Sequence, residues 1–126
     1  MALLSSRCLR AVWLGLALSV TGCASQSTLD SFYGVERTLS GVSEKSLQVG
    51  DHNWVYAEKG EGEVVVLLHG FAASKEVWMR MVADMPTGYR YIMPDLPGFG
   101  RSTYLADGNY DVPSQVPRLE AFVAQL

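Results

Sequence analysis

One apolar segment restricts the fold of this chain more than any other. Residues 64–68 are five consecutive Val and Leu residues, with no alternation between apolar and polar positions. A short strand that is apolar on both faces is typical of a parallel sheet covered by helices on both sides. A second strand is predicted at residues 89–93, and a helix that begins near Ser74 separates the two. Strands joined through a helix are expected to run parallel, with a right-handed crossover, so the predicted fold class is α/β.

A hairpin is predicted before these strands, and the first helix has an apolar face. Residues 46–49 and 54–59 are predicted to pair around a polar turn at residues 50–53. Ser74 is the candidate N-cap of the helix, and Pro86 ends it. Apolar residues recur at helical spacing within this helix, and we expect them in the core: Val77, Trp78, Met81, Val82 and Met85.

A second helix is predicted at the end of the sequence. We place its start at about Ser114, because Pro117 is tolerated only in a first turn. Its apolar residues again follow helical spacing: Val116, Leu119, Phe122, Val123 and Leu126.

The first residues are typical of a bacterial lipoprotein leader. Arg7 and Arg10 precede a short apolar run at residues 11–18, which fits the core of a secretory signal peptide and is too short to span a bilayer. Residues 20–23 read Val-Thr-Gly-Cys and resemble a lipobox, which predicts cleavage after residue 22 and lipidation of Cys23. Residues 23–45 are interpreted as a flexible tether.

Two motifs lie where ligand sites occur in parallel sheets, beyond the carboxyl ends of strands. His69, Gly70 and Phe71 follow the first parallel strand, and residues 94–102 (Pro-Asp-Leu-Pro-Gly-Phe-Gly-Arg-Ser) follow the second. In the second motif we expect Asp95 to accept hydrogen bonds from backbone N–H groups of a tight turn. Two glycines there, Gly98 and Gly100, are expected to adopt positive φ, and Arg101 to pair with Asp95 or with another carboxylate.

This pair of motifs resembles the α/β-hydrolase superfamily, and its spacing is most similar to that of bacterial lipases and esterases. The resemblance covers residues 46–126, which would be the N-terminal portion of an α/β-hydrolase domain. It implies that the Phe71 N–H is an oxyanion-hole donor, while Gly70 permits the sharp turn that exposes it. His69 then supports the loops structurally and is not the catalytic base.

The nucleophile motif of this superfamily, Gly-x-Ser-x-Gly, does not occur in the sequence. Nucleophile, acid and base are therefore expected to lie outside these 126 residues, and the chain alone is expected to be inactive. The function implied is serine-type hydrolysis of a carboxylic ester. Two alternatives remain open: a dehalogenase or epoxide hydrolase with an Asp nucleophile, and an inactive truncated lipoprotein.

Other polar residues are interpreted as structural. Ser74 and Ser102 are read as a cap and a turn residue, and His52 as part of a solvated turn beside Asp51. With two histidines far apart and both cysteines, Cys8 and Cys23, at the leader, no metal site is expected.

The composition of the sequence excludes one class of binding partner. The formal net charge of −3, without a basic run, argues against binding to nucleic acid. No cofactor is implied by the resemblance. The expected partners are an acyl-ester or lipid substrate and a membrane, reached through the lipid anchor at Cys23. The expected location is the bacterial cell envelope, most consistent with the outer membrane because no Asp follows Cys23.

Overall fold

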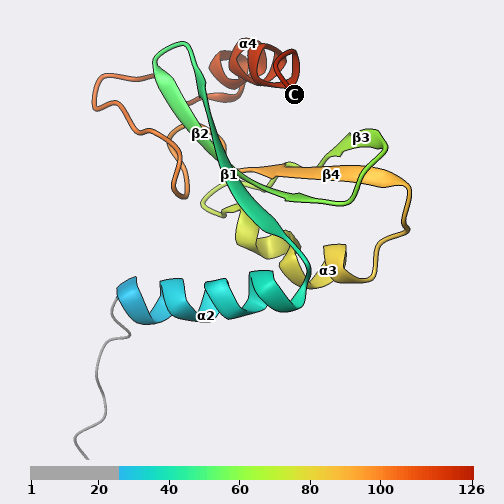
Figure 1. Cartoon of the computed structure of the whole chain (residues 1–126). Helices are drawn as coiled ribbons and strands as arrows, with labels where there is room; N and C mark the ends of the chain where they lie inside the picture. Colours follow the sequence, from blue (N-terminus) through green and yellow to red (C-terminus); the bar gives the residue numbers. More distant parts are fainter. Residues whose placement is uncertain (1–25) are drawn as a thin grey trace, which may run out of the picture. The chain divides into compact units, whose positions relative to one another are not determined.

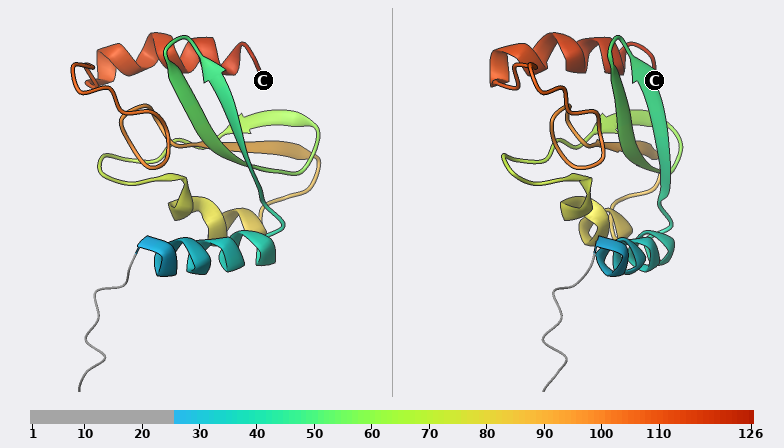
Figure 2. Two further views of the ribbon diagram at one scale, coloured as in Figure 1. Left: turned by 60° about the vertical axis from the view of Figure 1, so that its left-hand side comes forward. Right: turned by 90° about the vertical axis from the view of Figure 1, so that its left-hand side faces the viewer.

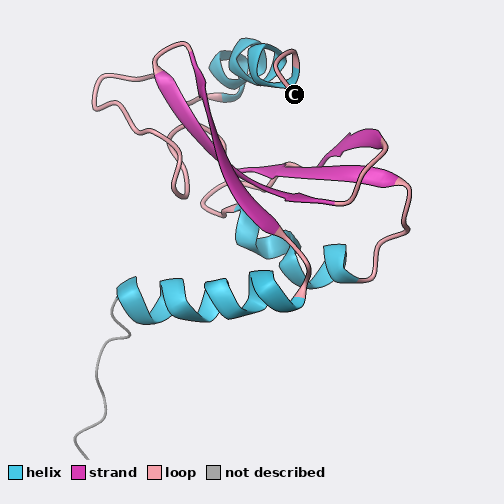
Figure 3. Ribbon diagram, viewed as in Figure 1, coloured by secondary structure: helices cyan, strands magenta, loops and turns pink. Residues whose placement is uncertain are grey.

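A computed structural model describes residues 26–126 of the chain (Figure 1). The predicted signal peptide and the lipidation site Cys23 lie outside the described residues. Residues 33–126 form one compact unit, which contains the whole sheet. The order of elements is α2 Gln26–Leu39, β1 Ser43–Val49, β2 His52–Lys59, β3 Glu63–Val66, the 3₁₀ helix η1 Lys75–Trp78, α3 Met79–Ala83, β4 Tyr89–Pro94 and α4 Val112–Val123 (Figure 3).

The sheet has four strands in the order β1-β2-β4-β3. β1 and β2 form the predicted antiparallel hairpin, and a two-residue loop joins them because Val49 pairs with His52. Gly50 in this loop has a φ of 60°, which residues with a side chain rarely adopt. β2 is antiparallel to β4, and β4 is parallel to β3. The α/β class and the parallel pair are therefore confirmed.

β3 is shorter than predicted, since the strand ends at Val66. One backbone hydrogen bond to β4 follows it, from Leu67 N–H to the Ile92 carbonyl. Its side chains nevertheless reach both faces of the sheet, since Val65 and Val66 contact different core clusters. Val64 is partly exposed, because β3 is the last strand in the sheet order.

Helices lie on both faces of this sheet, with α4 on one side and α3 on the other (Figure 2). Successive residues of a strand point to opposite faces, so each strand contributes to two cores. The core on the α4 side contains Val49, Trp54, Tyr56, Ile92 and Phe122, and the rings of Trp54 and Phe122 stack with centroids 4.4 Å apart. The core on the α3 side contains Ala57, Met79, Val82, Tyr91 and Met93.

The helix after Ser74 exposes part of its predicted apolar face. Val77 and Met81 are 56% and 46% exposed, whereas Met79 and Val82 are fully buried. The reason is that the first turn is a 3₁₀ helix with about three residues per turn, which rotates the buried face away from the α-helical expectation. Ser74 occupies the N-cap position, but its side chain makes no capping hydrogen bond.

α4 begins at Val112, earlier than predicted. The side chain of Asp111 caps this start by accepting a hydrogen bond from Ser114 N–H at 2.9 Å. Pro117 consequently lies inside the helix and not in its first turn, which corrects the sequence prediction. The Asp111 cap thus sets the start of the helix. Because Pro117 has no N–H, the helix lacks one backbone hydrogen bond at this position.

We expect the Pro117→Ala variant to have a higher free energy of unfolding, by about 1–3 kcal/mol. Alanine restores an N–H that can donate to the Pro113 carbonyl and removes the clash of the ring with that turn. Urea unfolding at pH 7 measures the change. Pro113→Ala is the matched control, because proline is tolerated in the first turn of a helix; a gain equal to that of Pro117→Ala would contradict the explanation.

Residues 26–39 form helix α2, so the predicted tether is wrong for this part of the chain. The helix ends in a Schellman motif, in which Gly41 N–H donates to the Thr38 carbonyl and Val42 N–H to the Arg37 carbonyl. Gly41 has a φ of 67°, and a glycine at this position is the sequence signal that could have revealed the end of the helix. β1 then begins at Ser43, three residues earlier than predicted. Within residues 26–126, no helix is both long and apolar enough to cross a membrane.

Candidate active site

The loops after β3 and β4 meet because these strands are neighbours in the sheet. The buried ring of His69 joins them: its Nε2 accepts a hydrogen bond from Leu96 N–H at 3.1 Å. Since Nε2 is the acceptor, the proton of the neutral ring lies on Nδ1, which is 2.8 Å from the Gly70 carbonyl oxygen. Both ring nitrogens are therefore occupied, which leaves His69 no free position for a general base.

The turn that follows carries the predicted oxyanion donor. Phe71 is 93% exposed and lies outside the β3–β4 ladder. Within residues 26–126, its N–H donates no hydrogen bond. The positive φ of this turn belongs to Ala72, at 56°, and a Cβ on Gly70 would meet no atom within 4 Å. The backbone strain of this turn therefore lies at Ala72 and not at Gly70.

A pocket of about 360 Å³ opens beside this turn. The three predicted motif residues His69, Gly70 and Phe71 all line it. The other lining residues are Leu68, just after β3, and residues of the β4–α4 loop and of α4: Leu96, Phe99, Tyr110, Val112, Gln115, Val116 and Leu119. The lining is largely apolar, and the Gln115 side chain is tied down, because its Nε2 donates to the Pro97 carbonyl at 2.7 Å. An apolar pocket with few polar groups is typical of sites for small apolar ligands.

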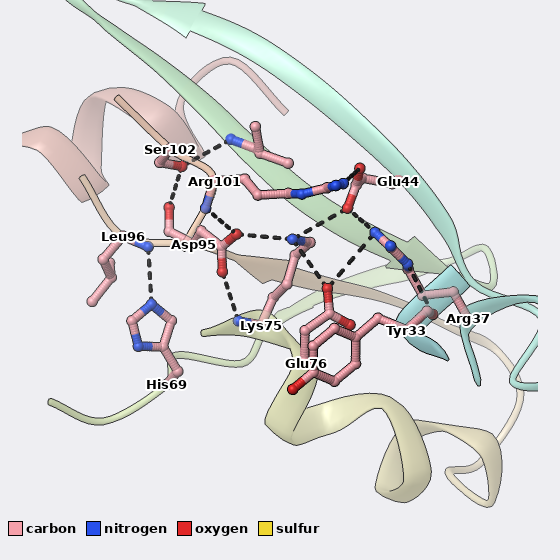
Figure 4. Close-up of polar contacts among 11 residues, drawn as sticks. Tyr33, Arg37, Glu44, His69, Lys75, Glu76, Asp95, Leu96, Arg101 and Ser102 are labelled. Atoms are coloured by element: carbon pink, nitrogen blue, oxygen red, sulfur yellow. Dashed lines mark hydrogen bonds and ion pairs between the residues drawn. The ribbon is translucent and has the colours of Figure 1, made fainter. Parts of the chain in front are cut away.

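Asp95 accepts backbone hydrogen bonds, as predicted (Figure 4). Its carboxylate takes the N–H of Lys75 at 2.7 Å and the N–H of Arg101 at 2.9 Å. Gly100 has a φ of 54°, and a Cβ there would lie 2.2 Å from the Asp95 carboxyl carbon. Gly98 also has positive φ, as predicted. Glycine at position 100 is thus required by both backbone conformation and space.

Sequence reasoning missed the main partner of this carboxylate. Lys75 is 1% exposed, and its Nζ lies 2.8 Å from Asp95 Oδ2. The Arg101 side chain was predicted to pair with Asp95 or with another carboxylate. It pairs with Glu44, at 2.8 Å between the guanidinium and the carboxylate. No local pattern marks Lys75, because its partner lies 20 residues further along the chain.

Two further carboxylates extend the pair into a network. Glu44 and Glu76 lie 3.2 Å and 3.3 Å from Lys75 Nζ. Arg37 pairs with both of these glutamates. Within the described residues, three cations and three carboxylates therefore share this region, which Figure 4 shows.

These contacts set protonation states. Burial alone would raise the pKa of Glu44, but the charges and hydrogen bond of Lys75, with Arg37 and Arg101, hold that pKa below its ordinary value of 4.5. Burial alone would lower the pKa of Lys75, but the hydrogen bond and charge of Asp95, with Glu76 and Glu44, raise it above 10.5. Lys75 and Glu44 are therefore both charged at neutral pH.

We expect the Glu44→Gln variant to lose less stability in acid than the unchanged protein. A carboxyl whose pKa is lowered by folding contributes stability above its unfolded pKa, and this contribution disappears as the pH falls through the folded pKa. For Glu44 the loss begins below about pH 4.5. Urea midpoints at pH 7 and at stepwise lower pH measure it. Glu61→Gln, at an exposed position, is the control; an acid slope equally changed by both variants would contradict the role of Glu44.

The remaining predicted positions are structural in this geometry. Ser102 Oγ donates to the Asp95 carbonyl at 2.6 Å and accepts from Val55 N–H at 2.9 Å. His52 was expected in a solvated turn, but it is only 2% exposed. Its Nδ1 lies 2.5 Å from Asp51, its Nε2 lies 3.4 Å from the hydroxyl of Tyr110, and the two rings pack edge to face.

Comparison with known proteins agrees with this architecture. Residues 63–126 match the family model described as the alpha/beta hydrolase fold. "Lipase 3" of Moraxella sp. (strain TA144) is 36% identical over 119 residues, which cover 84% of this chain and 38% of that protein. "Lipase 1" of Psychrobacter immobilis is 34% identical over 112 residues, which cover 82% and 35%. The crystal structure of a bacterial membrane phospholipase A superposes with a TM-score of 0.74 and 35% identity, covering 95% of this chain and 40% of that one.

The chain belongs to the alpha/beta hydrolase family, because the family model matches half of it. It spans less than half the length of each of these three relatives.

Proposed function

We propose that the protein takes part in serine-type hydrolysis of carboxylic esters, with an acyl or lipid substrate. The observation that carries the proposal is the Phe71 amide, which has no partner within residues 26–126 and lies beside an apolar pocket at the carboxyl ends of β3 and β4. The similarity to proteins named lipases supports the same substrate class.

The chemistry follows from the charge that ester hydrolysis creates. When a serine attacks the ester carbonyl, negative charge develops on the carbonyl oxygen, and preorganised N–H donors stabilise it. The Phe71 N–H supplies one donor, and the residue after the nucleophile supplies the other in this fold. The apolar lining around Phe99 and Val116 suits the hydrocarbon part of an acyl group.

We propose that the nucleophile, the acid and the base lie outside residues 1–126. The sequence contains no Gly-x-Ser-x-Gly motif. Ser102 is buried and holds two backbone groups, and both ring nitrogens of His69 are engaged. His52 contacts Asp51 and Tyr110 and does not line the pocket beside Phe71.

Turnover of a soluble nitrophenyl ester tests the proposal. The protein extended through its nucleophile should hydrolyse the ester, and a serine-directed phosphonate should abolish turnover and label one serine beyond residue 126. The 126-residue chain by itself should be inactive. Phosphonate-sensitive turnover by this chain would contradict the placement of the nucleophile. If the phosphonate does not inhibit the extended protein, and this protein turns over an epoxide or a haloalkane, the nucleophile would instead be an Asp. If the extended protein turns over none of these substrates, it would be an inactive lipoprotein.

We further propose that Cys23 carries a lipid anchor that holds the protein in the cell envelope, facing the periplasm or the surface at the outer membrane. The support is the sequence of residues 20–23 after a positively charged, apolar leader. Stable anchoring requires more than one acyl chain, which lipoprotein modification supplies. A Cys23→Ser variant should leave the detergent phase of a Triton X-114 partition; equal partition of both proteins would contradict the anchor.

A further inference from the structure

The buried Lys75–Asp95 pair needs an explanation other than fold stability. Their side chains are 1% and 0% exposed, so both charges have lost their hydration. A buried ion pair often contributes no more stability than apolar side chains of similar volume, because desolvation offsets the attraction. Such a pair is better explained by what it holds in place.

The pair lies at one end of the turn that carries Phe71. His69, just before this turn, is held by the N–H of Leu96 at 3.1 Å. Lys75, just after it, donates its backbone N–H to Asp95 Oδ1 at 2.7 Å. Asp95 and Leu96 are adjacent in sequence, so one short segment at the end of β4 fixes both ends of residues 70–74.

This turn requires such restraint. Ala72 has a φ of 56°, a conformation that residues with a Cβ rarely adopt. Within the described chain, one backbone hydrogen bond lies inside the turn, from Ala73 N–H to the Gly70 carbonyl at a long 3.3 Å. Strained backbone of this kind persists where the surroundings fix it and is concentrated at functional sites.

The Lys75 ammonium is one of three donors that bind the Asp95 carboxylate. The carboxylate accepts three donors: the N–H of Lys75, the N–H of Arg101 and the ammonium itself. Hydrogen bonds in which a partner is charged are about twice as strong as those between neutral groups, and a buried charge is costly unless it is paired and hydrogen-bonded. Glu44 and Glu76 lie 3.2 Å and 3.3 Å from the same ammonium and add to the attraction by which Asp95 holds it.

We propose that Lys75 is a positioning residue for the Phe71 amide. Its ammonium holds the Asp95 carboxylate in place at 2.8 Å, the carboxylate accepts the backbone N–H of Lys75 at 2.7 Å, and these contacts fix residues 70–74 so that the amide is preorganised beside the pocket. The catalytic consequence rests on the proposed ester hydrolysis, whereas the restraint of the turn does not.

The test compares Lys75→Met with Lys45→Met in the extended protein. Lys45 is the matched control, because it forms a 2.8 Å ion pair with Glu58 but is half-exposed and lies on β1, at the opposite end of the sheet order from β3. Hydrogen–deuterium exchange of peptides that cover residues 69–76 should become about tenfold faster in Lys75→Met, with β2 and β4 unchanged. Its kcat for a nitrophenyl ester should fall by about 10–100-fold, with KM within about twofold.

Other results would overturn the proposal. Unchanged exchange at residues 69–76, or an equal rise throughout the sheet, would show that Lys75 only stabilises the fold. If Lys75→Met does not fold, the double variant Lys75→Met/Asp95→Asn takes its place, because it leaves neither member of the buried pair as an unpaired charge. It should fold, and the amides of residues 70–75 should still exchange fast. Slow exchange of these amides would overturn the proposal. If the unchanged protein hydrolyses no ester, the proposed function fails, and exchange alone still decides whether Lys75 fixes the turn.

Discussion

The Asp95→Ala variant is expected to have a free energy of unfolding lower by about 3–5 kcal/mol, because it removes one partner of a buried ion pair. Lys75 would be left charged and 1% exposed, with only the more distant Glu44 and Glu76 as partners. The N–H groups of Lys75 and Arg101 would also lose their acceptor. Small domains have total stabilities of about 5–15 kcal/mol, so this change would unfold a large fraction of the protein near physiological temperature.

Urea unfolding followed by tryptophan fluorescence measures the effect, since Trp54 is fully buried in the core beside Phe122. Asp107→Ala, at an exposed loop position, is the control and should change stability by less than about 0.5 kcal/mol. A loss at Asp95 no larger than that at Asp107 would show that the buried network contributes nothing to folding.

The Phe71→Pro variant is expected to reduce kcat for ester hydrolysis by about 10²–10³-fold in the extended protein, because proline has no N–H to donate to the oxyanion. The substitution leaves secondary structure intact, since this amide lies outside the β3–β4 ladder and donates no hydrogen bond within residues 26–126. Proline also restricts the residue before it, and here that residue is Gly70, the least restricted type.

Phe71→Ala is the comparison variant, because it removes the exposed ring and keeps the amide. Its activity should exceed that of Phe71→Pro by at least about tenfold, with equal circular dichroism spectra for both. Equal activities would mean that the side chain and not the amide matters, and the oxyanion assignment would then be wrong.

The sequence was sufficient for the parts of the fold that depend on local pattern. The apolar run at residues 64–68 and the alternating strands predicted the sheet and its parallel pair, which the structure confirms. Gly98, Gly100 and Asp95 were predicted in their turn roles, because positive φ and acceptance of backbone N–H groups are properties of single residue types. The same local reasoning placed His69, Gly70 and Phe71 at the rim of the sheet, beside the pocket.

Errors occurred where two local signals competed. At α4 the proline rule placed the start too late, whereas the Asp111 cap sets it at Val112. After Ser74 an α-helical period was assumed, and the 3₁₀ turn buried Met79 while it exposed Met81. In residues 26–39 polar composition hid a helix whose end is marked by Gly41.

The sequence by itself determined which strands form, how two of them run and where the motif residues gather, because these follow from periods and turn preferences within a few residues. Only the tertiary structure decided that Lys75 meets Asp95 and that His52 is buried beside Tyr110. Burial of a charge or a polar ring depends on partners 20 to 58 residues away. Those partners come together only when the sheet sets its strand order, and no local pattern records that encounter.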